Sequence, residues 1–194
     1  MLGVALLLQA TAPVAPAEKP RHHVLGRVSI SAGFPRSSPH AELLSKDGYD
    51  LGARVGLDAA FSALPVDWLA VGVYGGVWRR ADDGGGGPTL GETLFRVGGE
   101  VAVPIQAGTS VLMLVGPEVG VARGTLSAGD GGQAQSALEY GAMFGLYGRV
   151  SRHFYLGGTA SYLLAPADPP SALGRDWDWG GFYLGLTGVL GDGS

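Results

Sequence analysis

Nine charged residues occur at alternate positions within apolar segments, and they are the side chains best placed to do chemistry. In 49-YDLGARVGLDAAF-61, Asp50, Arg54 and Asp58 share alternate positions with glycine and alanine, whereas the other positions are all apolar or aromatic. The full set is Arg27, Asp50, Arg54, Asp58, Arg96, Glu100, Glu118, Glu139 and Arg149. Because successive side chains of a strand point to opposite faces, these segments are predicted to be strands with one charged face and one apolar face free of charge.

The balance of signs indicates what these charges could do. Four arginines face five carboxylates, which favours a plug of ion pairs and hydrogen bonds that satisfies charges withdrawn from bulk water. The alternative is a gated ion path in which the pairs rearrange. A selective pore usually carries charges of one sign, so the sequence predicts a plug.

Other chemistries find little support in the sequence. The run Gly84 to Gly87 is not followed by the Gly-Lys-Ser/Thr of a phosphate-binding loop. The spacing of the loop aspartates matches no calcium loop, and without cysteine there is no thiolate chemistry. We therefore expect no catalytic residue, no cofactor and no metal site.

Eight segments show the period-two alternation or glycine-rich apolar composition expected of strands. They span residues 23–34, 49–61, 68–79, 94–105, 110–125, 138–150, 154–164 and 177–190. Each has ten or more residues, longer than the usual five or six of soluble proteins and close to the 9–11 tilted residues that cross a bilayer.

The connections alternate between long and short. Long, polar connections are expected near 35–48, 80–93, 126–137 and 165–176, and short ones near 62–67, 106–109 and 151–153. This alternation predicts an all-β fold, an eight-stranded antiparallel up-and-down transmembrane β-barrel with all its long loops at one rim.

Aromatic residues lie near the predicted strand ends. Those near the long loops are Phe34, Tyr49, Trp78, Phe95, Tyr140, Tyr162, Trp177 and Trp179, and those near the short turns are Phe61, Trp68 and Phe154. Aromatic belts at both membrane interfaces are typical of transmembrane barrels. The alternative is that these residues simply end the strands of a soluble protein.

Composition favours placing the charged face in the lumen. Charged residues make up 15% of the chain, and its only lysines are Lys19 and Lys46, whereas a soluble exterior is usually far richer in charge. A formal net charge of −4 also argues against nucleic acid as a partner. A soluble barrel with an apolar lumen and a charged exterior remains the alternative.

The chain begins with an apolar segment that resembles a secretory signal. Residues 1–17 hold a short apolar run and small-residue cleavage sites, but no charged segment precedes the run. We predict a signal peptide over 1–17 whose true start lies further upstream, a linker over 18–22 and the barrel over 23–191.

Glycine-rich strands such as 67-DWLAVGVYGGVWRR-80, together with the strand and loop pattern over about 22–191, make the chain resemble the small outer-membrane barrels of Gram-negative bacteria, the OmpA/OmpX-like group. The resemblance implies a monomer in outer-membrane lipid. It also implies a non-enzymatic role in membrane integrity, or in binding an extracellular or envelope partner through four long loops. A lipid-modifying enzyme of this size would show His and Ser two apart on a strand, whereas here Ser151 precedes His153 in a predicted turn. A narrow solute or ion channel and a soluble, periplasmic, lipocalin-like container are the alternatives.

Overall fold

The chain folds into one closed antiparallel barrel of eight long strands. The computed structural model describes residues 22–35, 52–82, 90–128, 131–167 and 177–192. The barrel strands are β1 (Val24–Pro35), β2 (Arg54–Val66), β3 (Leu69–Asp82), β4 (Leu90–Ala107), β5 (Val111–Ala128), β6 (Gly131–Arg149), β7 (Phe154–Leu164) and β10 (Gly181–Gly191). Within these ranges, no helix is long and apolar enough to span a membrane.

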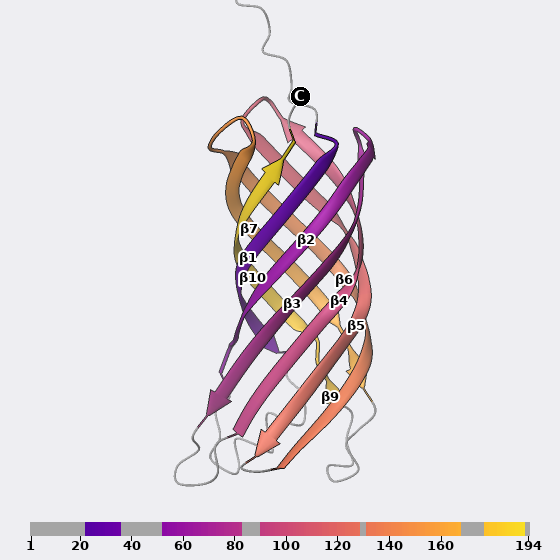
Figure 1. Ribbon diagram of the computed structural model, residues 1–194, viewed down its shortest axis with the longest axis vertical. Coiled ribbons are helices and arrows are strands. Elements are labelled where there is room, and N and C mark those ends of the chain that lie inside the picture. Colours follow the sequence, from indigo (N-terminus) through magenta and orange to yellow (C-terminus); the bar gives the residue numbers. More distant parts are fainter. Residues whose placement is uncertain (1–21, 36–51, 83–89, 129–130, 168–176, 193–194) are drawn as a thin grey trace, which may run out of the picture.

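Each barrel strand pairs with its neighbour in sequence, and the sheet closes where β1 meets β10. That closing ladder runs from Leu25↔Gly191 to Pro35↔Gly181, so no strand edge is left open along the seam. The described ends of the chain lie at the rim of the short turns, and the strand ends that the longer connections join lie at the opposite rim (Figure 1). The predicted up-and-down barrel is confirmed.

Several predicted boundaries near the long-loop rim were wrong, because β3 runs to Asp82 and β4 begins at Leu90, inside the expected loop 80–93. Residues 126–137, expected to be a long loop, instead extend β5 and β6 into a hairpin that pairs to Ala128↔Gly131. The same extension brings Leu90 of β4 opposite Ala128. The polar, glycine-rich composition of residues 126–137 indicates a loop. The backbone hydrogen bonds that join β5 to β4 and to β6 nevertheless continue through this segment as far as Ala128. The wall formed by β3 to β6 is therefore taller than the wall formed by β7, β10, β1 and β2.

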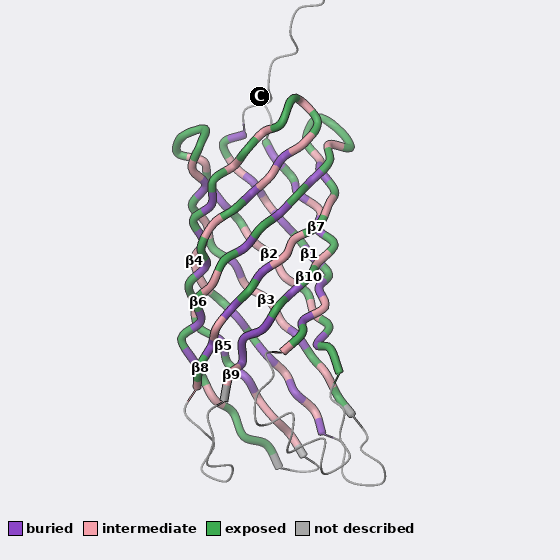
Figure 2. Tube along the Cα trace, turned by 180° about the vertical axis from the view of Figure 1, so that it is seen from behind, coloured by how far each residue is buried: buried purple, intermediate pink, exposed green. Residues whose placement is uncertain are grey.

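The predicted alternation of faces determines which residues line the lumen. On β2, Val55 and Leu57 are 62% and 55% exposed, whereas Arg54, which directly precedes Val55 and points to the other face, is 2% exposed. Figure 2 shows the same alternation of buried and exposed positions along the strands. Apolar side chains therefore point outward and charged ones inward, which contradicts the alternative of an apolar container with a charged exterior.

The aromatic residues divide between the two faces, which corrects part of the predicted belts. Those that point outward and are exposed are Phe34, Phe61, Trp68, Phe95, Tyr140 and Tyr162. Phe154 is half-buried, the backbone of Trp177 forms the short strand β9 (Trp177–Asp178), and Tyr49 lies outside the described residues. Trp78 and Trp179 are each 1% exposed and lie in the lumen, so their assignment to the interface was wrong.

Local geometry explains both buried tryptophans. Trp78 occupies the same face of β3 as Tyr74, four residues earlier, and this face points inward. Trp179 follows a small ribbon in which β8 (Pro166–Ala167) pairs with β9. The Asp178 carboxylate there accepts hydrogen bonds from the backbone N–H groups of Ala165 and Gly180 at 2.9 and 2.8 Å. This ribbon turns the chain inward ahead of β10.

Inward-facing glycines make room for these rings. A Cβ added at Gly124 would overlap the indole carbons of Trp179, and one added at Gly76 would lie 2.7 Å from Cη2 of Trp78. By contrast, a Cβ at the outward Gly26 meets no atom within 4 Å. Glycine in the lumen of this barrel therefore fills a packing role, because the interior of eight strands is only just wide enough for side chains.

We predict that Gly124→Ala destabilises the barrel, whereas Gly26→Ala does not. The added methyl group must displace a buried indole, and overpacking of this kind typically costs about 1–3 kcal/mol. The free energy of unfolding in detergent micelles, measured by denaturant titration, checks the result. Equal stabilities of the two variants would contradict the proposed packing role.

Candidate functional site: the barrel lumen

Arg96 of β4 is the centre of the lumenal charge network. Its Nε donates to the Glu139 carboxylate at 2.5 Å, and its Nη2 lies 3.7 Å from the Glu118 carboxylate. Tyr74 also donates its hydroxyl to Glu139 at 2.9 Å. Since both carboxylates and Arg96 are under 10% exposed, the pairing takes place almost entirely away from bulk water.

Three aromatic rings surround the same guanidinium. The Arg96 Cζ atom lies 4.8 Å from the ring centroid of Trp78 and 5.2 Å from those of Tyr74 and Tyr183. A desolvated cation this close to ring faces gains cation–π stabilisation in addition to its ion pairs. Trp78 therefore helps to hold the charge in the lumen.

A second pair lies nearer the short turns. Arg27 of β1 donates to Glu100 of β4, and Ser62 of β2 donates to the other oxygen of the same carboxylate at 2.5 Å. Arg27 also contacts the sulfur of Met143 at 3.8 Å. The Glu100 carboxylate thus accepts hydrogen bonds from two neighbouring strands, β1 and β2.

A third group lies nearer the long-loop rim and includes two residues that the sequence prediction missed. Glu92 of β4 accepts hydrogen bonds from Arg54 on one oxygen and from Arg80 on the other, the latter at 2.5 and 3.0 Å. Arg54 also donates to the Trp179 carbonyl at 2.7 Å and bonds the Tyr183 hydroxyl at 3.0 Å. Glu92 and Arg80 fell in a predicted loop, although each continues the inward alternation of its strand.

The remaining predicted charges lie elsewhere. Asp58 faces the lumen and accepts a hydrogen bond from Ser31 at 2.7 Å. Arg149 lies at the short-turn rim, where it donates to the carbonyls of Ser151 and Thr109 at 3.1 and 3.3 Å, apart from the network. Arg149 continues the inward alternation of β6. Because it is the last residue of that strand, its side chain contacts backbone carbonyls of the turns and not the lumenal carboxylates. Asp50 lies outside the described residues.

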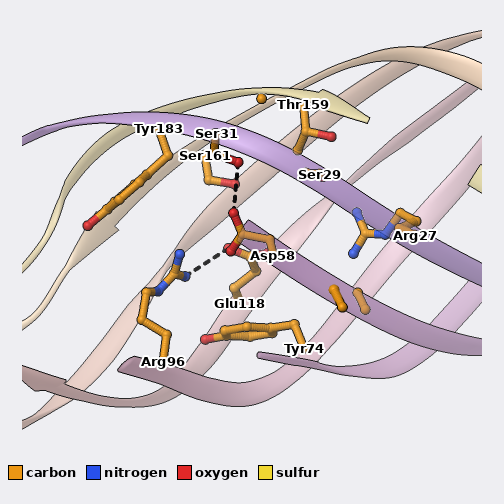
Figure 3. A pocket seen from close by; sticks show the side chains of 13 residues that line it. Arg27, Ser29, Ser31, Asp58, Tyr74, Arg96, Glu118, Thr159, Ser161 and Tyr183 are labelled. Carbon is orange, nitrogen blue, oxygen red and sulfur yellow. Dashed lines mark hydrogen bonds and ion pairs between the residues drawn. The ribbon is translucent and has the colours of Figure 1, made fainter. Parts of the chain in front are cut away.

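Part of the central network faces a small polar cavity. Its volume is about 40 Å³, above the roughly 10–15 Å³ that one water molecule requires. Charged and hydroxyl side chains line it, as Figure 3 shows for Arg96, Asp58 and Glu118. Hydroxyls continue from this cavity toward the short turns, because Ser29 bonds Thr187 at 2.7 Å and Thr187 bonds Thr159 at 2.8 Å.

Two clusters of buried, mostly apolar side chains flank this polar zone. The cluster near the short turns comprises Leu25, Ala70, Ala102, Leu112, Leu114, Met143, Tyr147, Tyr155 and Val189. The cluster near the long-loop rim comprises Trp78, Leu94, Ala122, Ala137, Leu163, Ala165, Trp179 and Tyr183. All these side chains are buried.

The short-turn mouth is further covered by the start of the first strand. His22 is 7% exposed and bonds the Tyr155 hydroxyl at 3.0 Å. Desolvation by burial lowers the pKa of His22, which favours the neutral imidazole. Asp192 accepts from the backbone N–H groups of His23 and Val24, and these hydrogen bonds, led by that of His23, lower its pKa.

Over the residues that the structure describes, the outward face of the strands carries two charges, contrary to the expectation that it carries none. Arg123 of β5 shares its face with Val119 and Val121, and Arg79 of β3 lies on the corresponding outward face. Both are exposed. They stand at the end of the apolar surface nearest the long-loop rim, where a charge need not enter hydrocarbon.

Chemically, the described part of the lumen offers paired charges of opposite sign. Over the described ranges, no cluster of three or more His, Cys, Asp or Glu residues is arranged to hold a metal ion. Ser151 and His153 are both exposed in the turn between β6 and β7.

We predict that Glu139→Gln destabilises the barrel by about 3 kcal/mol or more, because it leaves Arg96 as a buried, poorly paired cation. Arg149→Gln is the matched control, and loss of a partly exposed arginine should cost less than about 1 kcal/mol. Denaturant titration of the folded proteins in micelles measures both changes. A Glu139→Gln variant as stable as the control would show that the network does not stabilise the fold.

Known proteins resemble this chain in structure but not in sequence. No protein-family model and no curated protein sequence matches it. Neisserial surface protein A (NspA) superposes with a TM-score of 0.61 at 12% identity, covering 87% of this chain and 95% of NspA. OprG from Pseudomonas aeruginosa gives 0.56 at 14% identity, covering 89% and 96%. Ail, the attachment invasion locus protein of Yersinia pestis, gives 0.51 at 13% identity, covering 90% and 99%. Identities this low show the fold alone, and that fold is the small eight-stranded barrel of outer-membrane proteins.

Proposed function

We propose that this protein spans the outer membrane as a monomeric, non-conducting and non-enzymatic barrel that holds its long connections at the cell surface. The observation that supports the proposal is a lumen filled by two clusters of buried side chains with ion pairs between them. Such a core stabilises the barrel, but it leaves no continuous aqueous path.

The outer surface supports membrane insertion. On β5, the outward residues from Val111 to Val121 are all apolar over an 11-residue stretch, which matches the 9–11 tilted residues needed to cross the hydrocarbon core. Exposed side chains such as Ile30 at 62% and Leu186 at 64% continue this apolar surface on other strands. A water-soluble protein rarely exposes so extensive an apolar surface.

The near balance of lumenal charge supports a structural rather than a conducting role. The described network contains Arg27, Arg54, Arg80 and Arg96 against Asp58, Glu92, Glu100, Glu118 and Glu139. A cation- or anion-selective pore would be expected to carry an excess of one sign. Opening a path here would also require the large rings of Trp78 and Trp179 to move.

The rim supports a role in surface interaction. The strand ends joined by the longer connections gather at the rim away from the short turns, and the hairpin of β5 and β6 extends there beyond the ends of β1, β2, β7 and β10 (Figure 1). Two similar structures are named as a surface protein and as an attachment invasion locus protein. We infer that this rim meets an extracellular or envelope partner.

Two measurements test the proposal. The folded protein should migrate differently on a gel before and after boiling, as membrane barrels do, and it should need detergent to stay in solution. In planar bilayers it should give no steady single-channel openings, because both mouths are sealed by packed side chains. Steady openings would favour the narrow channel, and a folded protein soluble without detergent would rule out membrane insertion.

A further inference from the structure

The apolar outer surface ends abruptly along a line that includes two arginines. On β5 the outward residues change from Val119 and Val121 to Arg123, and then to Thr125 and Ser127. Arg79 stands at the corresponding point of β3, one outward position beyond Val77. Each arginine is therefore the first polar residue on its strand's outer face beyond the apolar surface.

On the strands between and beside these arginines, the outward residues change from apolar to polar at the same level. Arg79 pairs with Thr93 of β4, and Arg123 pairs with Phe95 of β4 and with Ser136 of β6. On β4, the outward residues change from Phe95 to Thr93, and on β6 from Leu138 to Ser136. Register thus aligns the change into one continuous boundary across four neighbouring strands.

This boundary marks the level of lipid headgroups in an inserted barrel. The apolar stretch of β5 that ends at Val121 is just long enough to cross the hydrocarbon core. Arg123 then lies immediately beyond it. A lipid-facing arginine is strongly unfavourable at the bilayer midplane but not near the interface. The position is therefore acceptable to a cation, and it is where lipid phosphates lie.

The two guanidinium groups are available to a ligand. Over residues 22–35, 52–82, 90–128, 131–167 and 177–192, the structure shows no hydrogen bond or ion pair for Arg79 or Arg123. The lumenal arginines differ in this respect, since Arg27, Arg54, Arg80 and Arg96 each pair with a carboxylate. Unpaired outward cations beside an apolar surface are complementary to an anionic, amphipathic ligand.

Their spacing suits a headgroup with two phosphates. With one strand between them and a two-residue offset in register, the two Cα atoms are about 12 Å apart for ordinary strand spacing. Phe95, 54% exposed, lies on the intervening strand. At the same rim the other walls present aromatic residues, Phe34, Phe182, Tyr162 and Tyr140, so the cationic boundary belongs to the β3 to β5 wall.

We propose that Arg79 and Arg123, on either side of Phe95, bind the two phosphates of a glycolipid headgroup in the leaflet on the long-loop side. Arginine holds phosphate through charge-assisted, bidentate hydrogen bonds. The acyl chains would lie on the apolar surface of Val97, Val119 and Val121. The inference rests on the proposed membrane insertion but not on any role of the loops.

Native mass spectrometry of the folded full-length chain in maltoside micelles tests this site, with bisphosphorylated lipid A as the probe. A single Arg79→Gln or Arg123→Gln change should weaken binding about fivefold, and the double change about 25-fold, if each cation near the lipid phosphates contributes as such residues usually do. Monophosphorylated lipid A should bind the unaltered protein about fivefold less tightly than the bisphosphorylated form, because one arginine then lacks a phosphate partner. Phosphatidylglycerol should bind more weakly still.

The matched control is Arg152→Gln, which removes an exposed arginine at the opposite rim and should leave lipid A binding unchanged. The double Arg→Lys variant should recover part of the affinity, since it keeps charge but loses bidentate geometry. Unchanged binding by the double Gln variant, or equal binding of phosphatidylglycerol, would overturn the proposal. Gel migration before and after boiling shows whether each variant is folded, so failure of insertion is distinguished from failure of lipid recognition.

Discussion

Charge pairing inside a narrow cylinder is the constraint on which the rest of this structure depends. An arginine that leaves bulk water keeps its proton, so it needs carboxylates or other acceptors within reach. Here Arg96 meets Glu139 and Glu118, contributed by two strands further along the sheet. These contacts link three neighbouring strands, and the pair of Arg27 on β1 with Glu100 on β4 joins two strands that are not neighbours. Together the pairs fix which faces of the strands point inward. The apolar exterior follows, because a strand that turns its charged face inward turns its charge-free face outward, as Val55 and Leu57 of β2 show.

Aromatic and small residues then share the lumenal space that the ion pairs leave. Trp78 lies against Arg96 and packs in the space left by inward glycines such as Gly76. Trp179 takes the space beside Gly124. The polar zone, with its small cavity, thereby lies between two clusters of buried side chains. Under the proposed function, the same side chains that stabilise the barrel also prevent passage through it.

Much of the fold could be predicted from the sequence, because period-two alternation carries the essential information. The inward positions of Arg54, Glu100 and Glu118 follow directly from that alternation. Where a strand is apolar on both faces, as around Trp78, alternation alone could not show which way the ring points. The hairpin at 126–137 was missed because its polar, glycine-rich composition is the same as that of a loop. Glu92 and Arg80 were missed with it, since their place in the network depends on how far the strands extend.

The two faces of this barrel impose very different restrictions on sequence change. An outward position such as Ile30 or Val97 contacts mainly surrounding hydrocarbon in the proposed setting, so any residue of similar hydrophobicity can serve. An inward position such as Gly124, with an indole beside it, permits almost no other side chain. Mutational drift can therefore alter about every second residue of each strand while the architecture persists. The low identity to similar barrels, 12% to NspA and 14% to OprG, is the outcome expected of such a division.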